Sequence, residues 1–133
     1  MENNNLGQVI KDKADSVIKG KSYSFALRII KAYQYISEEK REFVLSKQML
    51  RSGTAIGALV REAEHAQSIA DFINKMSIAL KEANETEYWL MLLKDSDYID
   101  ENSFKSIRKD CVEVLKLLIS IVKTTKENNV RKK

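Results

Sequence analysis

The most restrictive feature of the sequence is the absence of proline from all 133 residues, together with the presence of only four glycines. Proline and glycine most often end helices and form tight turns, so a chain almost without them favours long helices. Lys, Glu, Leu, Ile and Ala are abundant, and most of these residue types have high helix propensity. The composition therefore predicts an all-α protein.

Apolar residues recur every three or four positions in four segments, which is the pattern of amphipathic helices. The first predicted helix begins after Gly20, with Ser22 as its N-cap, and ends near residues 37–42. Residues 6–19 have a weaker helical pattern and predict a short leading helix that breaks at Gly20. The residues expected to be buried by the first helix are Phe25, Ala26, Ile29, Ile30, Tyr33 and Ile36.

Three further helices follow along the chain. The second covers about residues 44–66, and Ser68 followed by Asp71 resembles a capping box that opens the third. The third helix ends near Asp95, and the fourth begins after the polar turn 95–103. Short polar links between four amphipathic helices predict an up-down-up-down antiparallel four-helix bundle. We expect one domain over residues 1–133, with 1–20 as a leading segment and 126–133 as a basic tail.

Two glycines, Gly53 and Gly57, stand four residues apart inside the second predicted helix. A phosphate-binding loop requires a lysine after its last glycine and a preceding strand, and both are missing here. A membrane dimerisation motif is excluded as well, because Arg51 and Arg61 flank a segment too short to span a bilayer. The remaining interpretation is a place where another helix approaches closely.

Candidate catalytic and metal-binding residues are few. Glu62 and His65 have the spacing of the Glu-x-x-His motif of di-iron bundles, with Glu82 and Glu85 as further ligands, but that site needs two histidines and the chain has one. The single cysteine, Cys111, lies on the apolar stripe of the fourth helix, where a core thiol is expected. We therefore predict a non-enzyme with no catalytic residue, cofactor or metal. A metal-dependent enzyme using Glu62 and His65 is the weakest alternative.

The cellular location is predicted from what the sequence lacks. One cysteine cannot form an internal disulfide, which favours a reducing compartment. The first residues are polar and lack the apolar core of a signal peptide, and no run of about 18 apolar residues follows. We expect a cytoplasmic protein that has no membrane partner.

Two segments are apolar around almost the whole helix circumference, namely residues 88–93 and 114–122. An element of this kind must be covered on every side, and a lone bundle covers only one. We therefore predict a homo-oligomer in which the third and fourth helices contact a neighbouring subunit. The expected interface residues are Tyr88, Trp89, Met91, Leu92, Leu117 and Ile121.

The net charge of +4 is unevenly distributed along the chain. Residues 1–61 carry 11 basic and 6 acidic groups, residues 62–101 carry 3 and 10, and residues 102–133 carry 9 and 3. This alternation indicates either complementary faces between helices or subunits, or a basic surface for a polyanion such as RNA or DNA. An ordinary solvated helix face is the simpler alternative. The residues predicted to contact phosphates are Lys21, Arg28, Lys31, Lys105, Lys109, Lys116 and Lys123.

Several blocks of the sequence resemble a known family. The segments LSKQMLRSGTAIGA, DFINKMSIALKEA and ETEYWL together resemble the four-helix-bundle family of 23S rRNA intervening-sequence proteins, over about residues 20–125. This resemblance implies a four-helix bundle that assembles as a ring-like pentamer, and the family motif contains no catalytic residues. A similar fold occurs in the accessory variability determinant of retroelements, a basic pentamer that binds nucleic acid and a reverse transcriptase.

The leading hypothesis is thus a non-catalytic oligomer associated with nucleic acid through its basic helix faces. The alternative is a structural adaptor oligomer that docks a protein partner such as a reverse transcriptase, in which case the lysines only keep the protein soluble.

Overall fold

The computed structural model describes the backbone of residues 2–131 and the side chains of residues 14–130. Four helices make up almost all of this region, and residues 2–131 contain no strand. The all-α prediction is therefore confirmed. The helices are α1 (Glu2–Glu39), α2 (Leu45–Glu64), α3 (Ile69–Asp95) and α4 (Glu101–Arg131).

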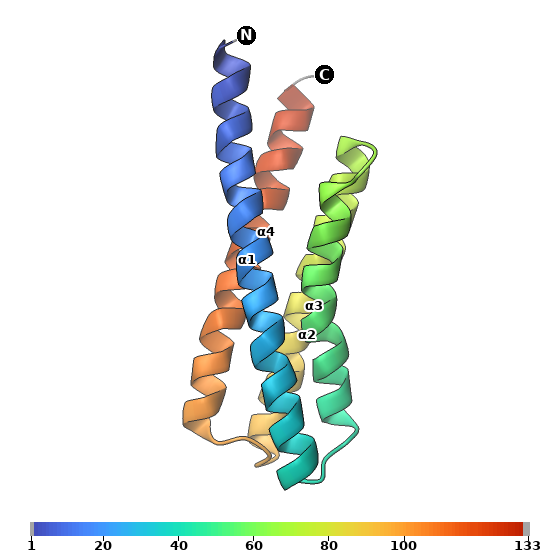
Figure 1. Cartoon of the computed structure of the whole chain (residues 1–133), viewed down its shortest axis with the longest axis vertical. Helices are drawn as coiled ribbons and strands as arrows, with labels where there is room; N and C mark the ends of the chain where they lie inside the picture. The colour runs from blue at the N-terminus through green and yellow to red at the C-terminus, as the bar shows by residue number, and fades with distance from the viewer. Residues whose placement is uncertain (1, 132–133) are drawn as a thin grey trace.

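The helices lie side by side along one long axis (Figure 1). α1 packs against α2 and α4, and α3 packs against the same two helices. Both ends of the chain and the α2–α3 link lie at one end of the molecule, and the other two links lie at the opposite end (Figure 1). The buried side chains of all four helices form one continuous core. Among the described residues, no helix is both long and apolar enough to cross a membrane.

The start of the first helix differs from the prediction. α1 continues through Gly20 without a break, and Ser22 is buried within the helix rather than acting as its N-cap. The Oγ of Ser22 donates a hydrogen bond to the carbonyl of Lys19, one turn earlier. A helical glycine costs only about 1 kcal/mol relative to alanine, and burial of Ile18 and Phe25 on either side of Gly20 offsets this cost.

The buried face of α1 is narrower than the sequence suggests. Phe25, Ile29 and Ile36 are fully buried, as expected. Ile30, also expected in the core, is 36% exposed, because it lies more than 90° around the helix from Phe25. Ala26 and Tyr33 are intermediate.

The helix ends explain the lengths of the links. Ser68 caps α3, and its Oγ accepts a hydrogen bond from Asp71 N–H at 3.0 Å, which confirms the predicted cap. α4 begins earlier than expected, because Asp100 accepts from Ser103 N–H at 2.8 Å. At the start of α2, the buried carboxylate of Glu42 accepts hydrogen bonds from the backbone N–H groups of Val44, Leu45 and Ser46.

The two glycines of α2 lie where α1 and α2 approach each other. A Cβ added to Gly53 would be 2.8 Å from Cγ2 of Ile29, which is closer than real Cβ atoms pack. A Cβ on Gly57 would be 3.6 Å from Ser22 Oγ, an ordinary contact distance. Close packing, the interpretation that remained after the sequence analysis, is confirmed at Gly53.

Candidate nucleic-acid interface

Four of the predicted phosphate-binding lysines lie together on the outer face of α4. At about 100° per residue their directions fall within roughly 40° of one another, and all four are exposed. On the opposite side of the helix, Cys111 and Leu118 are fully buried in the core. We name the four residues Lys105, Lys109, Lys116 and Lys123 the lysine face.

Three members of the lysine face have no acidic partner within residues 14–130. Lys105 Nζ lies 3.7 Å from Glu101 one turn earlier, a contact between two exposed side chains. Lys109, Lys116 and Lys123 have no ion pair within 4.0 Å among the residues whose side chains are described. Their charges are therefore available to an external anion.

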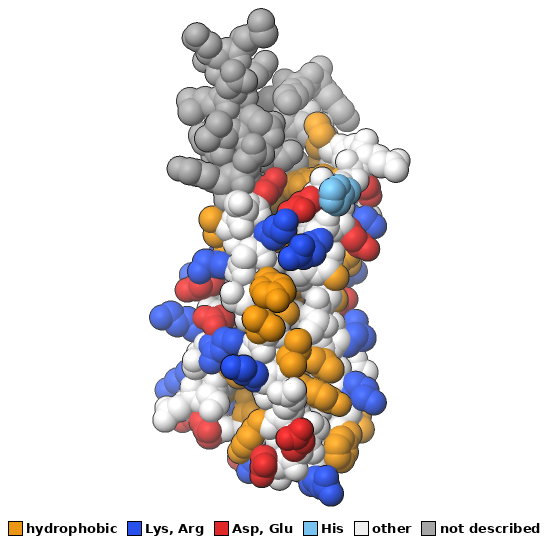
Figure 2. Space-filling view, in the orientation of Figure 1, with side chains coloured by type: hydrophobic (Ala, Val, Ile, Leu, Met, Phe, Trp, Pro, Cys, Tyr) orange, Lys and Arg blue, Asp and Glu red, His pale blue; other side chains and the backbone are white. Residues whose placement is uncertain are grey.

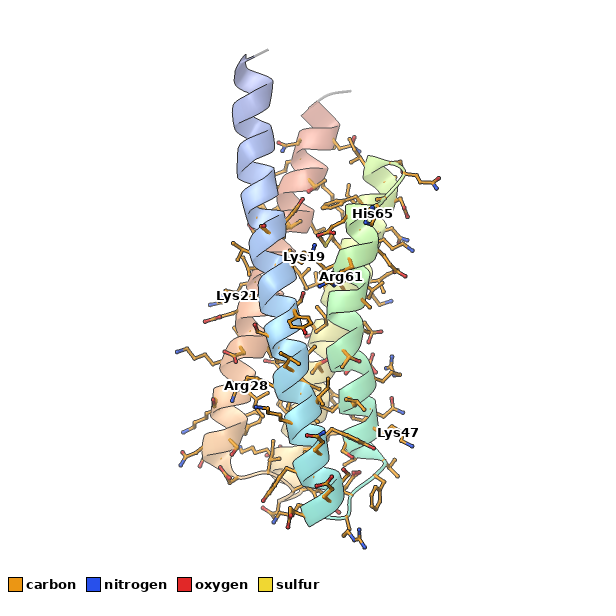
Figure 3. All side chains as sticks on the ribbon, in the orientation of Figure 1. Lys19, Lys21, Arg28, Lys47, Arg61 and His65 are labelled. Atoms are coloured by element: carbon orange, nitrogen blue, oxygen red, sulfur yellow. The ribbon has the colours of Figure 1, made fainter. Side chains whose placement is uncertain are left out.

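Two cations of α1 are used differently from the prediction. Lys21 Nζ lies 3.0 Å from Glu113 Oε2, and Arg28 Nη1 lies 2.6 Å from Asp110 Oδ2, so both pair with α4. Arg28 also donates to the carbonyl and the hydroxyl of Ser106, at 3.1 and 2.9 Å. Figure 3 shows both labelled side chains on the side of α1 nearer to α4. Complementary charges between helices, one of the two open alternatives, therefore account for Lys21 and Arg28.

Lys31, the remaining predicted residue, is exposed and has no ion pair among the described side chains. It lines a cavity of about 580 Å³ between α1 and the start of α4. Tyr35 lines the same cavity and is 49% exposed. The sequence did not predict a role for Tyr35, because the residue belongs to no motif. The cavity lies beside the lysine face, since Ser106 in its wall is three residues from Lys109.

The acidic residues of α3 pair with cations of neighbouring helices. Arg51 lies 3.4 Å from Glu82 and 2.6 Å from Glu85, and Glu85 also accepts from Trp89 Nε1 at 3.2 Å. Arg108 of α4 lies 3.1 Å from Glu87. The acidic middle of the sequence thus contacts basic residues of α2 and α4.

The candidate metal ligands are not brought together. Glu82 and Glu85 contact Arg51, whereas Glu62 is exposed on α2 and His65 is exposed at the C-cap that follows it. Among the described residues, no group of three or more His, Cys, Asp or Glu side chains is placed to hold a metal ion. Figure 3 shows His65 near the end of α2, on the same part of the molecule as the labelled cations Lys19 and Arg61.

Cys111 is fully buried, and its Sγ donates to the carbonyl of Ala83 at 3.4 Å. Burial raises the pKa of this thiol to about 12, Glu87 adds to the rise, and Arg108 opposes it. A thiol that keeps its proton is a poor nucleophile. The geometry agrees with the interpretation of Cys111 as a core residue.

The predicted oligomer interface residues are unevenly exposed. Tyr88 and Met91 are 54% and 45% exposed, whereas Trp89, Leu92 and Leu117 are half-buried. The expectation for Ile121 needs correction, because it is only 7% exposed and the core of its own chain already covers it.

A second exposed apolar stripe runs along α1 and was missed in the sequence, because its residues follow the same three-and-four spacing as the core. It consists of Tyr23, Leu27 and Ile30. Figure 2 shows an apolar patch in the middle of the face formed by α1 and α2.

Comparison with known proteins places these features in context. A family model described as 23S rRNA-intervening sequence protein matches residues 14–120. A crystal structure of a protein with unknown function, from the S23 ribosomal protein family of Bacteroides thetaiotaomicron VPI-5482, is 60% identical to the chain. That match covers 83% of this chain and 98% of the other, with a TM-score of 0.82. No curated protein matches the chain.

Proposed function

Because the chain belongs to the family of 23S rRNA-intervening sequence proteins, we propose that it is a non-catalytic, oligomeric protein that binds the backbone of RNA or DNA. The observation that carries this proposal is the lysine face, in which three exposed lysines of one helix lack an acidic partner among the described side chains. Residues 102–133 contain nine basic and three acidic groups, so the local charge is strongly positive.

The spacing of the lysine face suits a regular polyanion. Lys109, Lys116 and Lys123 follow one another at steps of seven residues, which is roughly 10.5 Å along the helix at about 1.5 Å per residue. One strand of a B-form duplex advances about 3.4 Å per nucleotide, so each step corresponds to about three phosphates. Contacts of this kind position a protein on a nucleic acid without reading its sequence.

Oligomerisation would repeat the lysine face and strengthen binding. The exposed side chains of Tyr88 and Met91 support contact with a second copy through α3. The positions of the three links in Figure 1 support the up-down-up-down topology. We extend the proposal to a homopentamer, as the family resemblance implies.

The absence of catalysis is part of the same proposal. The thiol of Cys111 keeps its proton at neutral pH, and its side chain is buried away from any substrate. The exposed residues Glu62 and His65 do not line the cavity between α1 and α4 that contains Lys31 and Tyr35. These placements support a binding role.

Fluorescence anisotropy with labelled RNA and DNA, measured at several salt concentrations, tests the proposal. The variant K109E/K116E reverses two charges of the lysine face, and we expect a loss of binding and a salt dependence shallower by roughly 1.4 to 1.8 in the slope of log K against log salt. The matched control is K47E/K81E, since Lys47 and Lys81 are exposed and unpaired within residues 14–130 and lie on α2 and α3.

Both double variants have the same formal charge, so a general electrostatic effect would weaken them equally. Equal weakening, or no binding by the wild-type protein at low salt, would overturn the proposal. Light scattering on both variants separates a loss of binding from a loss of assembly.

The adaptor function is favoured by a different observation, the exposed stripe of Tyr23, Leu27 and Ile30 on α1. A protein partner such as a reverse transcriptase would cover these side chains. The variant L27D places a charge in the stripe. Retained nucleic-acid binding together with lost binding of a purified reverse transcriptase, by surface plasmon resonance, would support the adaptor, and no effect on the partner would exclude this surface.

A further inference from the structure

The cavity between α1 and α4 combines three kinds of chemistry. Its lining includes the aromatic ring of Tyr35, the cations Arg28 and Lys31, and the polar groups of Asp100 and Asn102. Its volume of about 580 Å³ falls within the roughly 300–1,000 Å³ typical of small-ligand sites. An aromatic surface close to both a free cation and hydrogen-bonding groups suits a nucleotide, which has a flat base, a sugar and a phosphate.

Tyr35 provides a surface on which a base can stack. The side chain is 49% exposed, although it lines the cavity beside the buried residues Ile99 and Ile107. Tyr35 has no aromatic partner among the described rings, where the one close ring pair is Tyr88 with Trp89. Every base has a π-face, so stacking on Tyr35 would be tolerant of sequence.

The two cations of the cavity differ in whether a protein group already binds them. Contacts with Asp110 and Ser106 use three of the five N–H groups of Arg28 and fix the guanidinium, and the other two donors have no hydrogen-bond partner among the side chains of residues 14–130. Lys31 is exposed and forms no ion pair with a described side chain. Lys31 is therefore the residue that can neutralise a phosphate.

The opposite wall contains hydrogen-bond acceptors. Asp100 accepts from the backbone N–H and the hydroxyl of Ser103, at 2.8 and 3.0 Å, and these bonds lower the pKa of its carboxyl group. An ionised carboxylate repels a bare phosphate but accepts hydrogen bonds from a ribose hydroxyl or a base amino group. The two walls thus favour one orientation of a bound nucleotide, in which its phosphate lies toward Lys31 and its sugar or base lies toward Asp100.

The lysine face leads directly to this cavity. Ser106 lies in the cavity wall, and Lys109 follows it by three residues, so their Cβ atoms are about 5–6 Å apart. A strand whose phosphates follow Lys123, Lys116 and Lys109 therefore arrives beside Tyr35. We infer that the cavity between α1 and α4 binds one unstacked nucleotide of a single-stranded nucleic acid, with its base on Tyr35 and its phosphate on Lys31.

This inference rests on the proposed function, and its test uses a single-stranded 15-nucleotide oligomer with one 2-aminopurine. The fluorescence of 2-aminopurine falls when the base stacks, so binding to the wild-type protein should quench it. Y35A should abolish the quenching and weaken single-strand binding roughly 5- to 150-fold. Y35F should retain both, because the ring is kept.

The matched control is Y23A, since Tyr23 is a similarly exposed tyrosine of α1 that does not line the cavity. We expect Y23A to match wild type in quenching and in single-strand affinity, and we expect Y35A to bind a 15-base-pair duplex with unchanged affinity. Quenching that survives in Y35A, or an equal loss for single strands and duplex, would overturn the inference. If the wild-type protein binds single strands but shows no Tyr35-dependent quenching, only the role of the cavity is refuted. If it binds no nucleic acid at low salt, the proposed function is refuted as well.

Discussion

The contact between Gly53 and Ile29 gives the sharpest prediction about stability. In G53A the new methyl group would lie 2.8 Å and 2.9 Å from Cγ2 and Cγ1 of Ile29. Ile29 is fully buried and branched at Cβ, so it has few alternative rotamers. One of the two helices must therefore shift.

The magnitude follows from two opposing effects. Replacing a helical glycine by alanine stabilises by about 1 kcal/mol, and overpacking a core costs about 1–3 kcal/mol. We expect G53A to lose about 0–2 kcal/mol of unfolding free energy, which is the difference between these two ranges. In G57A the new methyl group would lie 3.6 Å from Ser22 Oγ, an ordinary contact, so this variant should keep the stabilisation gained by replacing a helical glycine. The unfolding free energies of the two variants should therefore differ by about 1–3 kcal/mol.

Chemical denaturation at a fixed protein concentration measures this difference, because the stability of an oligomer depends on concentration. A double-mutant cycle with I29A isolates the contact. In the I29A background both Cγ atoms are gone, so G53A should become neutral or stabilising. The reasoning is refuted if G53A is as stable as G57A, or if I29A leaves the effect of G53A unchanged.

Two further predictions concern single side chains. Glu42 accepts hydrogen bonds from the N–H groups of Val44, Leu45 and Ser46 at the start of α2, so E42A should lower the unfolding free energy by about 1–2 kcal/mol. E42Q should recover part of the loss because it keeps one acceptor oxygen, and an E42A as stable as wild type in urea would contradict the capping role. For Cys111, burial raises the thiol pKa from its ordinary value of 9.0 to about 12, so the unfolded chain releases this proton at lower pH than the native protein does. The protonated thiol contributes fully to the unfolding free energy below pH 9, and this contribution is lost as the pH rises toward 12. Unfolding free energies measured across this interval should therefore fall more steeply for wild type than for C111A. Parallel curves for the two proteins would exclude the buried thiol as the source.

Much of the fold follows from local patterns in the sequence. The second and third helices and the Ser68 cap depend on residues within a few positions of one another, so periodicity and capping chemistry locate them. The continuity of α1 through Gly20 could not be found in this way. Ser22 is a good N-cap by residue type, but burial among neighbouring helices decides that it lies inside α1.

The candidate site residues were less predictable, because their proposed roles depend on contacts between distant segments. In the sequence, Lys21 and Lys109 look equivalent. Lys21 pairs with Glu113, 92 positions away, whereas Lys109 has no partner among the described side chains. Tyr35 could not be identified at all, since its cavity forms only where α1 meets the start of α4.

The pairing of α1 with α4 also explains how the lysine face keeps its charge. Glu113 lies four residues after Lys109 and three before Lys116, so on an isolated helix its carboxylate would compete with a phosphate for both lysines. In the bundle, Lys21 holds that carboxylate at 3.0 Å. Arg28 holds Asp110, immediately after Lys109, at 2.6 Å. These exposed pairs contribute only about 0–1 kcal/mol each to stability. Their larger effect is on where the negative charges lie. The two pairs hold two of the three acidic groups of residues 102–133 toward α1, so the outer face of α4 presents mainly lysines.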